Sequence, residues 1–235
     1  ESVTVTAVYK TNPALTCSWN FKITRTKGYI TKQMLDTLDL TAIKKVMITA
    51  HPDDETLWGG GHLLEGEYLV VCMTHGWNPK RRTAFEQTMR TTNDKYLILD
   101  YPDVRKTLSN GKYETDMLST CKSAMQEDIN LILSYKKWDL IATHNPFGEY
   151  GKFLHKQISQ MVTQCYNKMT NKSATLYYFG RYYNANKKIP GEQIAPELLA
   201  IKNSMVARYY PTAKGAIVAF GHMIPYENWL LPSEW

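Results

Sequence analysis

The chain has 235 residues, enough for one domain with a sizeable core, and 43% of them are hydrophobic. No apolar stretch approaches the roughly 18 residues that a membrane helix needs, and the four cysteines form no CxxC pair, so neither a membrane span nor a cysteine zinc site is predicted. The net charge of +6 comes without a nucleic-acid-binding motif or a dense basic run, and no nucleic-acid partner is expected.

The first 42 residues are predicted to form an N-terminal extension packed on a single domain that spans residues 43–235. Residues 1–30 begin with alternating apolar and polar side chains, which is typical of one or two short strands, and an addition to the edge of the sheet is expected there. Residues 31–42 have the pattern of a short amphipathic helix. A chain that starts at Glu1 without Met favours a secreted or processed form, although the compartment stays unknown.

From residue 43 onward, apolar runs alternate with amphipathic helical patterns. Buried strands are predicted at residues 44–51, 68–74, 96–99, 138–143 and 176–179. Helices are predicted at residues 81–95, 115–135, 152–169 and 194–210. Strands that alternate with helices imply a mainly parallel sheet with helices on both faces. The predicted fold class is therefore α/β, with three layers.

The segment His51-Pro52-Asp53-Asp54 follows the first predicted strand. Pro52 stops the strand, so these side chains lie at its carboxyl end, the edge at which open α/β sheets bind ligands. An imidazole and a carboxylate are good zinc ligands, and a second carboxylate beside them can take a proton from water that a metal activates. The same string is also compatible with a polar turn in which one Asp caps the next helix.

A second histidine-bearing segment, residues 143–155, follows the fourth predicted strand. Lys152 and His155 are three residues apart at the start of a predicted helix, so they share a face. In a doubly wound sheet this loop can lie beside the first one, and His155 then completes a three-ligand zinc site with His51 and Asp54. A fourth position open to water is the mark of a catalytic zinc. Taken alone, His155 is also compatible with a surface or capping histidine.

Residues 50–55, together with the Gly-x-x-x-His pattern of residues 151–155, resemble the PIG-L/LmbE family of zinc-dependent N-deacetylases. The resemblance covers roughly residues 43–230 and is most specific in the string Ala-His-Pro-Asp-Asp-Glu. It implies a Rossmann-like fold and an N-acetylglucosamine conjugate as the substrate. It also implies Zn²⁺ as the cofactor, with His51, Asp54 and His155 as the metal ligands and Asp53 as the general base.

Two positions depart from the family's pattern. Family members often have a histidine where this chain has Lys152, and an acidic or amide residue where it has Leu154. The usual histidine assists at the oxyanion. A lysine ammonium can stabilise an oxyanion as a point charge, but it is a poor acid near neutral pH unless it is desolvated. Lys152 or His222 is therefore predicted to supply this donor, and His222 is also compatible with a structural role.

Three further residues are candidates for binding the substrate. Arg82 is predicted to contact sugar hydroxyls or a phosphate, and the rings of Tyr150 and Trp77 are predicted to offer faces for sugar stacking. Each has a structural alternative, which is a solvated helix charge for Arg82 and core packing for the two aromatic residues.

The resulting hypothesis is a zinc-dependent hydrolase that removes the acetyl group from an N-acetylglucosamine-type conjugate. One alternative keeps the same site but acts on another N-acyl substrate, such as an acylated glycopeptide or a small metabolite. A second alternative is a non-catalytic carbohydrate-binding relative, which the lysine at position 152 makes plausible. The sequence gives no oligomeric state.

Overall fold

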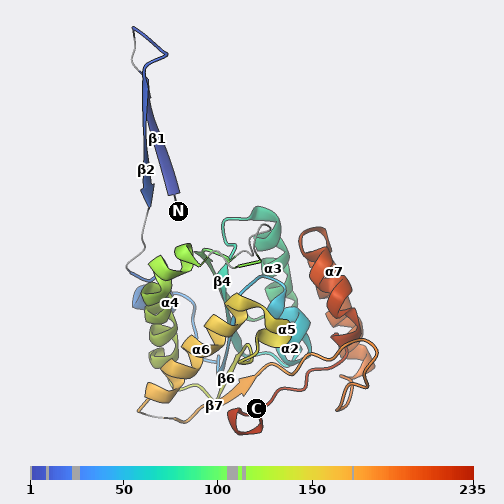
Figure 1. The fold of residues 1–235 in the computed structure, drawn as a ribbon. Coiled ribbons are helices and arrows are strands. Elements are labelled where there is room, and N and C mark those ends of the chain that lie inside the picture. Colours follow the sequence, from blue (N-terminus) through green and yellow to red (C-terminus); the bar gives the residue numbers. More distant parts are fainter. Residues whose placement is uncertain (1, 9–10, 23–26, 105–110, 113–114, 171) are drawn as a thin grey trace.

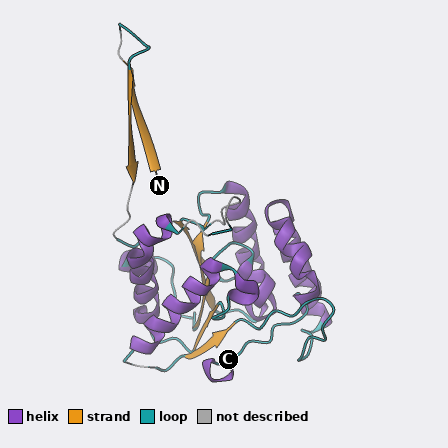
Figure 2. Cartoon of the chain, in the orientation of Figure 1, coloured by secondary structure: helices purple, strands orange, loops and turns teal. Residues whose placement is uncertain are grey.

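A five-stranded parallel sheet forms the centre of the protein, seen here as a computed structural model that describes residues 2–8, 11–22, 27–104, 111–112, 115–170 and 172–235 (Figure 1). Its strand order is β5-β4-β3-β6-β7. The strands are β3 (Lys45–Thr49), β4 (Tyr68–Thr74), β5 (Lys95–Tyr101), β6 (Leu140–Thr143) and β7 (Thr175–Tyr178). Helices cover both faces of the sheet (Figure 2), so the fold is the predicted α/β, Rossmann-like three-layer sandwich.

Each face of the sheet has its own hydrophobic core, because successive side chains of a strand point to opposite faces. β4 is buried at every position, and its alternate residues belong to the two different cores. The first core is closed by α1 (Lys32–Asp36), α4 (Asp116–Tyr135) and α6 (Phe153–Lys168). The second core is closed by α2 (Asp54–Leu64), α3 (Pro79–Thr92) and α7 (Pro196–Phe220). Within the described part of the chain, no helix combines the length and the apolar character that a bilayer span requires.

The N-terminal strands form a separate antiparallel hairpin, in which β1 (Ser2–Val8) pairs with β2 (Thr16–Lys22). Figure 1 shows this hairpin standing away from the helices and the central sheet. The expected addition to the edge of the central sheet is therefore wrong. An alternating pattern indicates that a segment is a strand, but it does not determine which other strand this segment pairs with.

The residues that follow the hairpin are fixed to the domain by α4. The carboxylate of Asp128 accepts the backbone N–H groups of Tyr29 and Ile30 at 2.8 Å each. Ile30, Leu35 and Leu40 belong to the first hydrophobic core. The segment that leads into the sheet is thus held by both hydrogen bonds and burial.

The last helix is longer than the sequence predicts. α7 continues past Pro211 to Phe220, and its backbone is non-helical at Ala213, where φ is −130°. A proline inside a helix removes one hydrogen bond and clashes with the preceding turn, so it kinks the helix without always ending it. The extra turns matter because they carry residues to the functional site.

The direction of the sheet's connections reverses between β3 and β6. The chain passes from β3 outward to β4 and β5, and later returns to the other side of β3 with β6 and β7. Ile48 pairs with Thr143, so the carboxyl ends of β3 and β6 lie side by side. Ligands of open α/β sheets bind in the crevice outside such a reversal.

Three consecutive glycines inside α2 permit close packing of this helix against its neighbours. A β-carbon on Gly59 would lie 2.7 Å from Cε of Met47, and one on Gly60 would lie 2.9 Å from Cγ of Lys202. Both distances are too short for any residue other than glycine without a shift of these neighbours. These glycines therefore allow neighbouring side chains to approach the backbone of α2 closely.

A buried ion pair holds α2 against the C-terminal part of the chain. The ammonium of Lys202, a residue with no exposed surface, lies 2.6 Å from a carboxylate oxygen of Glu227. The same carboxylate accepts the backbone N–H groups of Gly61 at 2.6 Å and His62 at 3.0 Å. The pair therefore joins α7 and the C-terminal segment to the helix that begins with Asp54.

We predict that Lys202→Met lowers the free energy of unfolding by about 3–5 kcal/mol, because Glu227 would stay buried without its cation. Urea denaturation of the variant and the wild type measures the difference. Lys187→Met replaces an exposed lysine and is the matched control, for which a change within about 0.5 kcal/mol is expected. Equal stability of the two variants would contradict the role of the ion pair.

Candidate metal centre

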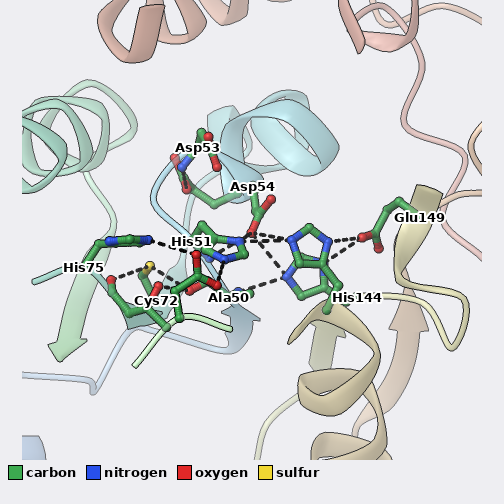
Figure 3. A network of polar contacts seen from close by, with 12 residues as sticks. Ala50, His51, Asp53, Asp54, Cys72, His75, His144 and Glu149 are labelled. Atoms are coloured by element: carbon green, nitrogen blue, oxygen red, sulfur yellow. Dashed lines mark hydrogen bonds and ion pairs between the residues drawn. The ribbon is translucent and has the colours of Figure 1, made fainter. Parts of the chain in front are cut away.

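Three buried side chains converge at the carboxyl ends of β3 and β6 (Figure 3). The Nδ1 atom of His51 lies 3.2 Å from Oδ2 of Asp54 and 3.1 Å from Nε2 of His155, and the latter two atoms are 3.3 Å apart. In a tetrahedral zinc site with bonds of about 2.0–2.1 Å, neighbouring ligand atoms are about 3.3 Å apart. The structure thus brings together the three residues predicted as metal ligands, with spacings that suit a small divalent cation.

A carboxylate lies behind each of the two metal-facing imidazoles. Nε2 of His51 is 2.9 Å from Oδ1 of Asp103, and Nδ1 of His155 is 2.5 Å from Oε2 of Glu149. When each ring donates its N–H to the carboxylate behind it, the other ring nitrogen presents a lone pair to the centre. Two lone pairs and a carboxylate oxygen then face one another, and a cation between them removes their repulsion. This donor set fits a divalent metal.

The charges around His51 favour a cation at the same place. Burial alone would lower the pKa of His51, but hydrogen bonds and charge interactions with Asp103 and Asp54 raise this pKa to about 9. The surroundings therefore stabilise positive charge on the ring or beside it. A metal bound at Nδ1 satisfies the same attraction that otherwise holds a proton there.

His144 supports the centre from the end of β6, and sequence reasoning did not assign it a role. Its Nδ1 donates to Glu149 at 3.0 Å, and its Nε2 accepts the backbone N–H of Ala50 at 2.9 Å. The ring is fully buried and stacks on the ring of His155, with centroids 3.9 Å apart. Figure 3 shows His144 and Glu149 together on one side of His51. His144 thus links the end of β3 to the carboxylate that orients His155.

Burial and neighbouring charges shift the pKa values of the two adjacent aspartates in opposite directions. Burial, and then the negative charge of Asp54, raise the pKa of Asp53 to about 8. Burial alone would also raise the pKa of Asp54, but the imidazoles of His155 and His144 hold it well below its usual value. A pair of carboxyl groups with separated pKa values can divide two roles, with Asp54 as a permanent anion and Asp53 as a group that exchanges a proton.

Asp53 has a strained backbone that its neighbours hold in place. Its φ of 141° lies outside the usual region for a residue with a side chain. The carboxylate of Glu55 accepts the backbone N–H of Asp53 at 3.0 Å and the hydroxyl groups of Thr56 and Tyr209 at 2.6 Å each. Tyr209 belongs to α7, so a contact from the C-terminal half of the chain stabilises the loop that carries Asp53.

The centre opens into a pocket of about 90 Å³. Three predicted residues outside the ligand set line it, namely Asp53, Lys152 and Tyr150. Apolar side chains, one arginine and one further aspartate complete the lining. The full set is His51, Asp53, Asp54, Leu57, Trp58, Arg81, Asp103, Tyr150, Lys152, Ala216 and Phe220.

Three other predicted residues do not line this pocket. Nε2 of His222 is 2.7 Å from the carbonyl oxygen of Tyr183. Trp77 is 63% exposed. Nε of Arg82 donates to a backbone carbonyl at 2.7 Å, and Arg81 lines the pocket in its place. Successive helical residues are turned by about 100° from each other, so a shift of one residue along α3 decides which guanidinium reaches the pocket.

Sequence reasoning also did not single out Asp103 and Glu149. The signal for Asp103 is its place after β5, in Tyr101-Pro102-Asp103, where a strand is followed by Pro-Asp as it is at residues 51–53. Glu149 lies in α5 (Gly148–Gly151), which follows β6. Both carboxylates were therefore detectable as acidic residues at the carboxyl ends of other strands of the same sheet.

The fold and the site define an α/β protein with a candidate metal centre at the reversal point of its sheet. The chain is similar to the Uncharacterized protein L374 of Acanthamoeba polyphaga mimivirus, with 29% identity over a 175-residue alignment that covers 67% of this chain and 67% of that protein. In structure it is similar to the conserved protein TT1542 from Thermus thermophilus, with a TM-score of 0.55 and 14% identity over 82% of this chain and 96% of that chain. The second likeness shows a shared fold. No family model matches the chain.

We predict that Asp103→Asn weakens zinc binding by about 10- to 100-fold, because an amide holds the N–H of His51 less strongly than a carboxylate does. Competition with a chromophoric chelator measures the affinity of the metal-stripped protein. His155→Ala removes a ligand and should lose the tight site altogether. Asp139→Asn replaces an exposed aspartate and should bind zinc as the wild type does. Unchanged zinc affinity in His155→Ala would contradict this centre.

Proposed function

We propose that this chain is a zinc-dependent N-deacetylase of the PIG-L/LmbE type, acting on an N-acetylglucosamine-type conjugate. The observation that carries the proposal is the convergence of His51, Asp54 and His155 beside Asp53, a buried acid that lines the same pocket. The resemblance of residues 50–55 to the family supports the acetylated amino sugar as the substrate class. Zinc held by these ligands would supply a Lewis acid that lowers the pKa of water and polarises a carbonyl.

Asp53 is the general base in this proposal. The carboxylate accepts a proton from the attacking water, and the protonated carboxyl then delivers it to the amine nitrogen that leaves. A cation beside Asp53 would lower its raised pKa and so favour the carboxylate form, which accepts the proton. Glu55 holds the strained backbone of Asp53, which fixes the point from which its side chain reaches the pocket.

The pocket supports a small acyl group. About 90 Å³ of space, bounded by apolar side chains such as Leu57, Trp58 and Phe220, suits an acetyl group better than a long acyl chain. Two cationic side chains, Arg81 and Lys152, line the same space. Of the two predicted oxyanion donors, Lys152 therefore has the better position, and its ammonium would stabilise the developing negative charge as a point charge.

We predict that Asp53→Asn lowers the rate of acetate release from N-acetylglucosamine conjugates by about 10²- to 10⁴-fold, because the amide cannot accept the proton. Acetate is measured with metal-stripped protein before and after zinc is restored. The variant should still bind one zinc ion, which separates loss of the base from loss of the metal.

Release of another acid from an acylated glycopeptide or metabolite would point to a different N-acyl substrate. Sugar binding without acetate release, by wild-type protein that contains zinc, would point to a non-catalytic binding protein and contradict the proposed activity. Such a protein would also tolerate Asp53→Asn.

Lys152→Ala is predicted to lower the turnover number by about 10- to 100-fold with little change in zinc affinity, because it removes a donor that acts on the oxyanion. Steady-state kinetics with the same acetate assay measure the effect. Lys168→Ala, at the exposed far end of α6, is the matched control. An unchanged turnover number in Lys152→Ala would show that Lys152 has no such role.

A further inference from the structure

We propose that His75 and Asp103 form a second, weaker site for a divalent cation beside the candidate metal centre, and that an ion bound there inhibits the protein when zinc is in excess. Asp103 also lies behind His51, so the second site touches the centre through one carboxylate. The inhibitory effect rests on the proposed deacetylase function, whereas binding of the second ion does not.

The fold places the two side chains at the carboxyl ends of neighbouring strands. β4 ends directly before His75, and β5 ends two residues before Asp103. The two strands are adjacent in the sheet, so the loops that follow them start side by side. The backbone N–H of Gly76 donates to the carbonyl oxygen of Leu99 at 2.9 Å, which holds the loop after β4 against β5.

A nitrogen of His75 and an oxygen of Asp103 face each other at a distance that a hydrogen bond does not explain. Nε2 of His75 lies 3.7 Å from Oδ2 of Asp103. A hydrogen bond between a charged imidazole and a carboxylate is about 2.7–2.9 Å long. Two ligand atoms of a tetrahedral zinc ion are about 3.3 Å apart, so a shift of about 0.4 Å lets both atoms bind one ion.

The ring of His75 has nitrogens that no residue described in the structure uses in a hydrogen bond. Its Nδ1 is buried without a partner, and its Nε2 has only the long contact with Asp103. Nearly all buried polar atoms of proteins have a partner. Unused nitrogens on a largely buried ring therefore point to a ligand that the chain does not itself supply.

The carboxylate of Asp103 has one oxygen engaged and one that faces only His75. Oδ1 accepts the N–H of His51 at 2.9 Å and the backbone N–H of Val104 at 2.8 Å. Oδ2 is the atom that faces the imidazole of His75. The two side chains are 13% and 18% exposed, so an ion can reach them from the solvent. The pair offers an imidazole nitrogen and a carboxylate oxygen, which suit a divalent ion such as zinc.

A similar cluster on the other side of the centre lacks these features. Atoms of His144, Glu149 and His155 also lie close enough to hold a metal ion. Their side chains have no exposed surface, and the two imidazoles already bond to the carboxylate at 3.0 and 2.5 Å. Figure 3 shows this cluster and His75 on opposite sides of His51. The second ion is therefore expected on the side of His75.

An ion at the second site would act on the centre through Asp103. The carboxylate holds the N–H of His51, and a cation on Oδ2 would withdraw negative charge from that hydrogen bond. Loss of such a partner typically costs about 10- to 100-fold in metal affinity or activity. Filling the second site would therefore slow the proposed reaction.

Equilibrium dialysis of metal-stripped protein against rising zinc concentrations, followed by metal analysis, tests binding without reference to activity. We expect two ions per chain, the second held about 100-fold more weakly because it has two protein ligands rather than three. His75→Asn should keep the first ion and lose the second. Asparagine tolerates the φ of 65° at this position, so the loop keeps its shape.

His62→Asn is the matched control. His62 is another partly exposed histidine, and its Nδ1 lies 3.8 Å from a carboxylate oxygen of Glu65. This variant should bind two ions as the wild type does. A second ion that persists in His75→Asn, or that disappears in His62→Asn, would lie elsewhere and overturn the inference. Binding of a single ion by the wild type at saturating zinc would also overturn it.

A measurement on the wild type covers the case in which His75→Asn does not fold, as judged by urea denaturation. Anomalous X-ray scattering from crystals grown in excess zinc locates each bound ion. A second ion between His75 and Asp103 supports the inference, and a second ion at any other place overturns it.

Acetate release tests the inhibitory effect separately. The wild type should lose about tenfold of its rate as the second site fills, and the rate of His75→Asn should stay constant over the same range of zinc. Two bound ions without this loss would overturn the inhibition. Two bound ions in a protein that releases no acetate with one ion per chain would overturn the proposed deacetylase and leave the second site standing.

Discussion

Two carboxylates, the part-buried Asp103 and the buried Glu149, orient the two histidines of the candidate metal centre, and the rest of the site depends on this interaction. Asp103 lies behind His51 and Glu149 lies behind His155, so the free nitrogen of each ring faces the carboxylate of Asp54. The two rings come from segments that lie far apart in the chain. They meet because β3 and β6 are neighbours at the point where the sheet reverses direction. The two free ring nitrogens and the oxygen of Asp54 are all hydrogen-bond acceptors, so they would repel one another without a cation between them.

The same centre is tied to the C-terminal part of the chain at two points. Tyr209 donates to Glu55, which holds the strained backbone of Asp53. Lys202 pairs with Glu227, whose carboxylate accepts two backbone N–H groups of α2. The glycines of α2 allow these approaches because any side chain there would displace a buried neighbour. α7 is therefore a support for the functional loop as well as a cover for one hydrophobic core. Its extension beyond the kink at Ala213 also brings Phe220 to the pocket.

The metal pocket is where the proposed chemistry would take place. It combines the candidate metal ligands with Asp53 and Lys152, and its volume suits the acyl group and the reacting atoms.

The sequence by itself determined the alternation of strands and helices, and it placed His51, Asp53, Asp54 and His155 at strand or helix ends. Those features depend on local periodicity and on proline as a stop signal, which a single chain segment contains. Only the tertiary structure decided that Arg81 rather than Arg82 reaches the pocket, that His222 bonds to a backbone carbonyl outside it, and that the N-terminal hairpin stays apart from the central sheet. It also decided that Asp103, His144 and Glu149 complete the centre. Each of these depends on which distant segments become neighbours, and that choice follows from the packing of whole helices and strands rather than from any local pattern.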